Sequence, residues 1–272
     1  MNILYLYSEL MPYNIPVLKI FTEKYSAKVN VISWDNRKLT PYITPDINGV
    51  DFFLRSSFNF KRLYTHIKDF NPDIIYVSGW MDKLYLLTLI PFKFKGKLIV
   101  TGCDTLWTGS LIQVLKSLVI RVTKNLFFTH IWIPGPLQYK YSSNLGFKKN
   151  NTVFNCYSAD VDLFNKAILN DKYQTNIKKR FIYVGRLEKI KGLDLLVQAW
   201  KNLQEFHKDW ELVIIGSGDY ETVLAKEQNI ILHPFKSQDE LIEEIKNAHC
   251  FILPSIDAPA GACFTKYWSP SL

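Results

Sequence analysis

A glycine followed by basic residues, at the end of an apolar run, is the feature of this sequence best suited to chemistry. Gly185 and Arg186 end one such run, and Lys191 and Gly192 precede a helical pattern. Glycine lets a ligand approach the backbone, and the first N–H groups of a helix favour an anion. Arg186 can bind phosphate oxygens through two N–H groups, and Lys191 adds a point charge. The loop is predicted to bind a diphosphate and to stabilise its growing charge as a leaving group; a turn with solvated charges is the alternative.

Later turns repeat the arrangement of an apolar run followed by a glycine or a polar residue. Gly216 and Gly218 follow the next apolar run, where a nucleotide could approach the backbone. Phe235 follows a third run, so its ring is a candidate for contact with a base, and Ser255 follows a fourth. The glycine turn alone is equally typical of a structural turn, and Phe235 and Ser255 taken alone are more typical of a structural role.

Taken in order, these residues resemble the donor domain of family 4 (group 1) glycosyltransferases, which are retaining enzymes with two Rossmann-like domains. The resemblance covers residues 180 to 261. It implies that Arg186 and Lys191 contact the donor diphosphate as catalytic residues. The donor-binding residues that it implies are Gly185, Gly216, Gly218, Phe235 and Ser255. It also implies a nucleotide-sugar as the substrate, with no metal and no further cofactor.

The N-terminal half is similar to the acceptor domain of the same family. Its expected acceptor-side residues follow the first and the fourth predicted strands and are Tyr13, Asn14 and Trp80. Asp104 follows the next strand, at about the position where many relatives carry a catalytic-site histidine, and it is the third catalytic candidate. A helix N-cap is the alternative role of Asp104.

The sequence departs from the family pattern after Ser255. The family continues with two glutamates, one beside the transferred sugar and one at the ribose, where this sequence has Ala258 and Lys266. Alanine loses those hydrogen bonds, and a lysine cannot accept any. We therefore expect a truncated C-terminal domain. A catalytically inactive nucleotide-binding remnant is the alternative to an active enzyme.

Short apolar runs alternate with longer amphipathic segments along the chain. The predicted strands are 2–7, 28–33, 50–54, 74–78, 97–101, 131–134, 151–154, 180–184, 211–215, 230–233 and 250–253. The predicted helices include 61–70, 107–127, 193–206, 219–227 and 237–248. Buried strands separated by helices favour parallel sheets covered on both faces. The predicted fold class is α/β, with two doubly wound Rossmann-like domains of the GT-B type, the second incomplete.

A polar segment divides this pattern into two domains. Residues 1–165 are the predicted N-terminal acceptor-side domain, 166–179 the linker, and 180–272 the C-terminal nucleotide-sugar-binding domain. Ligands of such folds bind outside the carboxyl ends of the strands. The candidate residues named above all follow predicted strands, which is where this rule places a site.

Composition narrows the class of partner. The 272 residues are 48% hydrophobic and carry a net charge of +8, which favours an anionic partner. The basic residues are scattered, so we expect no nucleic acid partner. Residues 7–12 contain no glycine, which excludes a dinucleotide-binding oxidoreductase. The sequence starts without a signal-peptide pattern, and its longest apolar runs are too short to span a bilayer, so we expect a cytoplasmic protein.

The segment 107–127 leaves two interpretations open. With Lys116, Arg121 and Lys124 it could lie on anionic lipid near a lipid-linked acceptor, as a peripheral contact at the inner membrane face. The alternative is a helix that packs its apolar residues into the core and exposes a basic edge.

The resemblance implies a glycosyltransferase that moves a sugar from a nucleotide-sugar to a glycan or lipid-linked acceptor. Retention of the anomeric configuration is implied by the resemblance, and a role in surface polysaccharide synthesis is expected. The donor diphosphate itself could act as the base for the incoming hydroxyl, which would explain why no pair of carboxylates stands out.

Overall fold

The chain folds into two compact α/β units, Met1–Ala159 and Asp160–Leu272. The structure is a computed structural model, which describes residues 1–35, 42–157, 160–161, 163–165 and 179–256. The predicted linker, 166–179, lies outside the described residues apart from Lys179, the first residue of a strand. Ala258 and Lys266 also lie outside them.

The first unit contains a parallel sheet of seven strands in the order β3-β2-β1-β4-β5-β6-β7. These strands are β1 (Asn2–Tyr7), β2 (Lys28–Ser33), β3 (Val50–Leu54), β4 (Ile74–Val77), β5 (Leu98–Gly102), β6 (His130–Trp132) and β7 (Thr152–Val153). The helices are α1 (Ile15–Tyr25), α2 (Phe60–Phe70), α3 (Lys83–Phe94), α4 (Leu111–Phe127) and α5 (Pro136–Asn144). The strand order reverses between β1 and β4, which is the switch point where doubly wound folds bind ligands.

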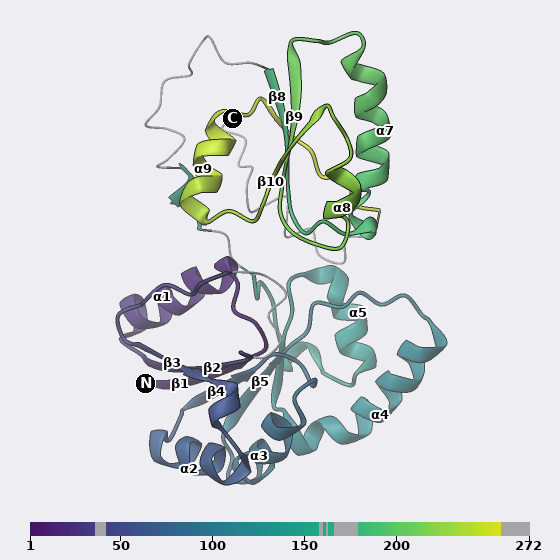
Figure 1. The fold of residues 1–272 in the computed structure, drawn as a ribbon. Coiled ribbons are helices and arrows are strands. Elements are labelled where there is room, and N and C mark those ends of the chain that lie inside the picture. Colours follow the sequence, from purple (N-terminus) through teal and green to yellow (C-terminus); the bar gives the residue numbers. More distant parts are fainter. Residues whose placement is uncertain (36–41, 158–159, 162, 166–178, 257–272) are drawn as a thin grey trace. The chain divides into compact units, whose positions relative to one another are not determined.

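Alternate residues of β1 point into two different cores. Leu4 and Leu6 belong to the core that α2, α3 and α5 cover, whereas Tyr5 belongs to the core on the α1 face. Figure 1 shows α1 on one side of this sheet and α2 and α3 on the other. A strand with both faces buried has no polar alternation, and this explains why β1 has no charged or amide side chain from Ile3 to Tyr7.

The second unit contains a parallel sheet of four strands in the order β10-β9-β8-β11. These strands are β8 (Lys179–Val184), β9 (Trp210–Ile215), β10 (Ile230–His233) and β11 (Cys250–Phe251). The helices are α7 (Leu193–Gln204), α8 (Glu221–Leu224) and α9 (Gln238–Lys246). Residues of α7 and α8 pack on one face, with Trp200 as the largest side chain, and Leu241 of α9 packs on the other (Figure 1).

Capping residues define the ends of several helices. Asn59, Ser110 and Ser237 accept hydrogen bonds from backbone N–H groups at the starts of α2, α4 and α9. Such caps satisfy donors that have no partner inside the helix. Asn71 ends α2 in the left-handed conformation, which asparagine tolerates better than most residues.

The structure confirms the predicted α/β class and two Rossmann-like sheets. The predicted strands 2–7, 28–33, 50–54 and 230–233 have the same limits in the structure. The predicted helix 219–227 is wrong in length, because α8 covers only Glu221–Leu224. Among the described residues, no helix is both long enough and apolar enough to span a bilayer.

Candidate functional site

In the second unit, the loops after β8 and β9 are in direct contact at the carboxyl ends of the strands. The N–H of Gly185 donates to Ile215 O at 3.0 Å, and the N–H of Leu187 donates to Ser217 O at 3.0 Å. The N–H of Tyr220 donates to Leu187 O at 2.9 Å. These bonds hold the loop that carries Arg186 against the turn 216–218.

Glycine is required where these two loops meet. Gly216 has φ +154° and Gly218 has φ +157°, which L-residues rarely adopt. A Cβ on Gly216 would overlap the carbonyl group of Gly185, and one on Gly218 would overlap the backbone of Leu187. The close approach of the loops therefore accounts for both glycines without any ligand. Their predicted contact with a nucleotide stays a prediction.

The loop after β8 leads into α7 through a short 3-10 turn, Lys189–Lys191. Gly192 follows in the left-handed conformation, φ +69°, and is the N-cap of α7, which has no side-chain cap. The predicted helix start near Gly192 is thus confirmed. An N-terminus without a side-chain cap directs backbone N–H groups outward, as an anion site requires.

The loop after β11 lies against the start of α7. A Cβ on Gly192 would overlap the carbonyl group of Pro254, and the N–H of Ile256 donates to Ile190 O at 3.2 Å. Next to Pro254, the Ser255 hydroxyl is buried and has no hydrogen-bond partner among the described residues. A buried hydroxyl without a partner is costly, so a ligand atom beside it would be stabilising.

Arg186 is not free in this loop. One of its terminal guanidinium nitrogens forms an ion pair with Glu188 Oε1 at 2.8 Å, and the Arg186 side chain is 49% exposed. Its carbonyl oxygen accepts a hydrogen bond from the Tyr183 hydroxyl at 2.9 Å, which fixes the backbone while the guanidinium faces solvent. The pairing with Glu188 was not anticipated, although the two residues are only two positions apart.

Phe235 follows β10 and adjoins the same edge of the sheet. Its N–H donates to the hydroxyl of Ser217 at 3.4 Å. The structure thus brings Gly185, Arg186, Gly216, Gly218 and Phe235 together at one sheet edge. Lys191 and Ser255 join them through the contacts of Gly192 with Pro254. No contact assigns a ligand to any of these residues, so their roles stay predictions.

In the first unit, Asp104 lies among tyrosines after β5. The Tyr157 hydroxyl donates to Asp104 Oδ2 at 2.8 Å, and Tyr13 packs edge-on against Tyr157 with ring centroids 4.9 Å apart. Burial and the charge of Asp104 raise the pKa of Tyr157 far above its usual value, so Tyr157 stays a neutral donor. The N-cap alternative for Asp104 is wrong, because Ser110 caps α4.

The other two acceptor-side candidates differ in exposure. Asn14 is buried, and its Oδ1 accepts a hydrogen bond from the N–H of Met11 at 2.9 Å. The side-chain oxygen of Asn14 thus already has a protein partner. Trp80 is half-buried against the core on the α2–α3 side.

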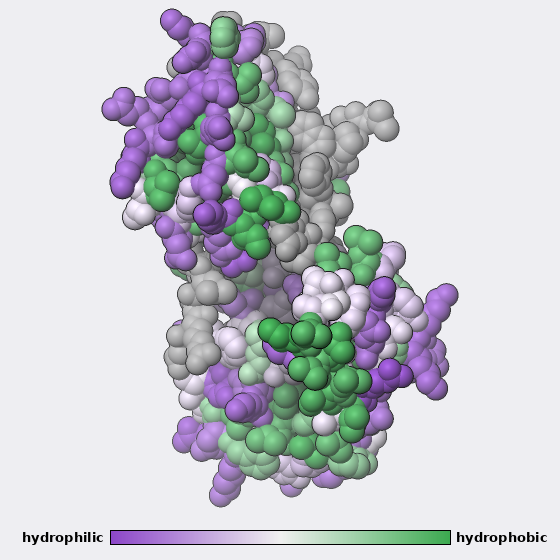
Figure 2. Space-filling view, turned by 90° about the vertical axis from the view of Figure 1, so that its right-hand side faces the viewer, coloured by the Kyte–Doolittle hydropathy of each residue, from purple (hydrophilic) through white to green (hydrophobic). Residues whose placement is uncertain are grey.

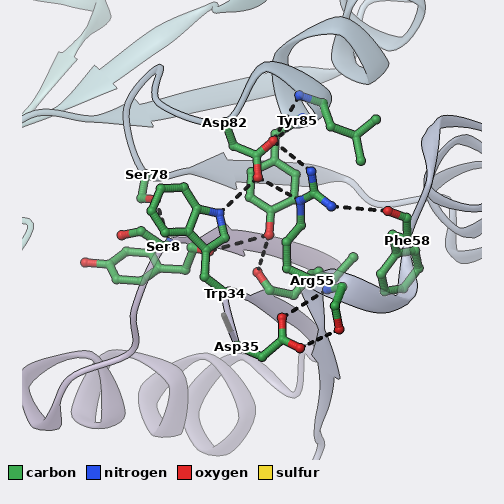
Figure 3. A network of polar contacts seen from close by, with 12 residues as sticks. Ser8, Trp34, Asp35, Arg55, Phe58, Ser78, Asp82 and Tyr85 are labelled. Atoms are coloured by element: carbon green, nitrogen blue, oxygen red, sulfur yellow. Dashed lines mark hydrogen bonds and ion pairs between the residues drawn. The ribbon is translucent and has the colours of Figure 1, made fainter. Parts of the chain in front are cut away.

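A polar network next to Trp80 holds the loop after β4 (Figure 3). Asp82 Oδ2 accepts hydrogen bonds from Arg55 Nε at 2.7 Å and from Trp34 Nε1 at 2.9 Å, and Asp82 Oδ1 caps α3. At the switch point, the N–H of Ser8 donates to Ser78 Oγ at 2.9 Å. These contacts give the loops after β1 and β4 a fixed shape, and the sequence pattern did not reveal them.

Comparison with known proteins shows which family this chain is similar to. Residues 166–265 match the family described as "Glycosyl transferases group 1". The match covers most of the second unit, which is thus similar to a group 1 glycosyltransferase domain. The amylovoran biosynthesis glycosyltransferase AmsK of Erwinia amylovora is 28% identical over 119 residues, which are 39% of this chain and 29% of that protein. The uncharacterized glycosyltransferase MJ1607 of Methanocaldococcus jannaschii is 27% identical over 117 residues, 39% of this chain and 30% of that protein.

Solved glycosyltransferase structures share the fold of the whole chain. Anabaena Alr3699/HepE in complex with UDP has a TM-score of 0.64 and 14% identity, and the match covers 94% of this chain and 75% of that chain. The E. coli trehalose-6-phosphate structure bound with UDP-2-fluoro glucose has a TM-score of 0.64 and 10% identity, and covers 98% and 81%. The two units therefore have the GT-B type of fold.

Proposed function

We propose that this chain transfers a sugar from a nucleotide-sugar to a glycan or lipid-linked acceptor, with retention and in surface polysaccharide synthesis. The observation that supports it most is that the loop after β8, which leads into the uncapped start of α7, contacts both the turn after β9 and the loop after β11. Arg186 and Lys191 both precede this helix start in sequence and supply the positive charge that a diphosphate needs. The solved relatives bound to UDP or a UDP-sugar support the class of donor.

In the proposed reaction, the donor diphosphate gains negative charge as the bond to the sugar breaks. Arg186 and Lys191 stabilise that charge together with the N–H groups at the start of α7. Arg186 must exchange its ion pair with Glu188 for the diphosphate, and a half-exposed pair contributes little enough to allow this. Arg186 and Lys191 supply the positive charge that balances the diphosphate, and we propose that no metal takes part.

Calorimetric titration with UDP, GDP and ADP tests the donor site. Arg186→Ala and Lys191→Ala are each expected to weaken binding about 10-fold or more, since hydrogen bonds to charged groups contribute about 1.5–3 kcal/mol. Lys208→Ala is the matched control, because Lys208 is exposed and lies before β9, at the opposite end of its strand. EDTA is expected to leave the affinity unchanged. Unchanged affinity in both site variants would remove Arg186 and Lys191 from the site.

Binding without transfer is the second candidate function. Ala258 and Lys266 stand where the family resemblance places two glutamates that contact the sugar and the ribose. Incubation with UDP-, GDP- and ADP-sugars distinguishes the candidates, because only an enzyme releases the nucleoside diphosphate. Binding that depends on Arg186, combined with no release from any donor, would support the binding protein and contradict the transferase.

A further inference from the structure

Helix α4 turns large apolar side chains toward solvent. Those at least 43% exposed are Leu111, Ile112, Leu115, Leu118, Val119, Val122 and Leu126. Figure 2 shows them as a continuous hydrophobic area on the face of the first unit turned toward the viewer. Contiguous exposed apolar patches of this kind are uncommon on monomeric soluble proteins, and they mark interaction sites.

The exposed side chains form one stripe. At about 100° per residue, all seven fall within about 120° of the helix circumference. The opposite side of α4 faces the protein: Ser117 is buried, Ile120 packs against the core, and α4 lies beside α3 and α5. An amphipathic helix normally turns its apolar stripe inward, so the orientation of α4 is reversed. The interpretation of 107–127 as a helix with its apolar residues in the core is therefore wrong.

Positive charge is concentrated in the same part of the chain. Residues 83–159 contain ten of the 33 Lys and Arg residues but only one of the 25 acidic residues, Asp104. The rest of the chain has 23 basic and 24 acidic residues. The net charge of +8 thus arises from the segment that runs from α3 to β7, and α4 lies in its middle.

Basic side chains border the stripe. At about 100° per residue, Lys116 and Arg121 project on its two sides. Lys124 lies 5.0 Å above the ring of Phe147. Burial lowers the pKa of Lys124, as do the charges of Lys148 and Lys93, so basic groups from α3, α4 and the loop after α5 lie near one another. Long basic side chains beside an apolar stripe can keep their charges at lipid headgroups while the stripe enters the bilayer.

We propose that the outer face of α4 docks on an anionic lipid bilayer. The stripe is long enough to lie along the boundary between headgroups and acyl chains, and the basic border matches an anionic surface. A second copy of the chain is a poorer match. Two α4 faces in contact would bring Lys116 and Arg121 toward like charges, and residues 105–159 contain no acidic residue to pair with them.

Flotation with lipid vesicles tests the proposal and requires no nucleotide. The full chain is expected to bind vesicles of phosphatidylcholine and phosphatidylglycerol far better than phosphatidylcholine alone, and added salt is expected to weaken binding by screening. Val119→Glu with Val122→Glu is expected to reduce the bound fraction at least about tenfold. Both positions are exposed, so thermal unfolding is expected to be unchanged.

The matched control is Leu195→Glu with Phe206→Glu, which adds the same charge at exposed apolar positions in and just after α7. This control is expected to bind vesicles like the unaltered chain. Failure of the unaltered chain to bind anionic vesicles would overturn the proposal, and so would equal loss in both double variants. A dimer in sedimentation velocity that the α4 variant separates, without vesicle binding, would instead assign the face to a second copy. Nucleotide affinity is measured in a separate experiment, so a lack of vesicle binding would not contradict the proposed donor site.

Discussion

Arg186 illustrates how a predicted ligand contact depends on its neighbours. In the loop after β8 the guanidinium is paired with Glu188 at 2.8 Å, and both side chains are partly exposed. Surface pairs of this kind contribute about 0–1 kcal/mol. The pair therefore holds Arg186 near the start of α7 at little cost, yet it competes with any diphosphate that binds there.

Removing the competing carboxylate gives the first residue-scale prediction. Glu188→Gln is expected to tighten UDP binding by up to about fivefold, because up to about 1 kcal/mol of pairing no longer has to be exchanged. The measurement is calorimetry, repeated in an Arg186→Ala background, where the effect is expected to vanish. Weaker binding by Glu188→Gln would mean that Glu188 positions Arg186 instead of competing for it.

Asp82 gives a prediction with a defined pH dependence. Burial opposes ionisation of Asp82, but hydrogen bonds from Arg55 and Trp34 outweigh it, so the pKa of Asp82 is lowered. Because the folded-state pKa is the lower one, the stabilisation is complete at neutral pH. It is lost as the pH falls from about 4 through that lower value.

Urea unfolding of Asp82→Asn measures this contribution. At pH 7 the variant is expected to lose about 1–3 kcal/mol, because the charged hydrogen bonds with Arg55 are weakened while asparagine still caps α3. Near pH 3 the difference from the unaltered chain is expected to shrink. Asp51→Asn, at an exposed position in β3, is the control. A difference that stays constant with pH would exclude ionisation of Asp82 as the cause.

At the scale of elements, the donor-side site depends on how closely the loops after β8 and β9 approach. Gly216→Ala places a Cβ against the carbonyl group of Gly185 at φ +154°. We expect a loss of at least about 2 kcal/mol of unfolding free energy, from backbone strain together with separation of the loops. Urea unfolding measures the loss.

Gly96→Ala separates these two causes. Gly96 also has a positive φ, +80°, but a Cβ there would meet nothing within 4 Å. That variant is expected to lose only about 1 kcal/mol, from the left-handed backbone alone. If Gly216→Ala costs no more than Gly96→Ala, the loops after β8 and β9 can separate freely and the argument for a rigid site fails.

At the scale of the whole molecule, each unit has cores of its own on both faces of its own sheet. We expect Asp82→Asn to lower amide protection in β1 and β4, and Gly216→Ala to lower it in β8 and β9. Hydrogen exchange followed by mass spectrometry measures each unit separately. In the double variant the two effects are expected to add within about 0.5 kcal/mol. Loss of protection in β1 caused by Gly216→Ala would show that the units unfold together.

The sequence by itself determined the alternation of strands and helices, and hence the α/β class. β1 is buried on both faces and apolar from Ile3 to Tyr7, so its limits can be predicted without the fold, and the predicted limits of β2 and β3 also match the structure. The turn glycines and the basic loop at 185–192 could also be identified from the sequence, because backbone geometry and charge are local properties.

Only the tertiary structure decided which distant residues meet and which way a helix faces. The bond between Asp104 and Tyr157 joins residues 53 positions apart, and that between Asp82 and Arg55 spans 27. The apolar stripe of α4 predicts an amphipathic helix, but it does not determine which side of the helix packs against the protein. Which side is buried depends on the packing of α4 beside α3 and α5, a long-range property that periodicity along the chain cannot express.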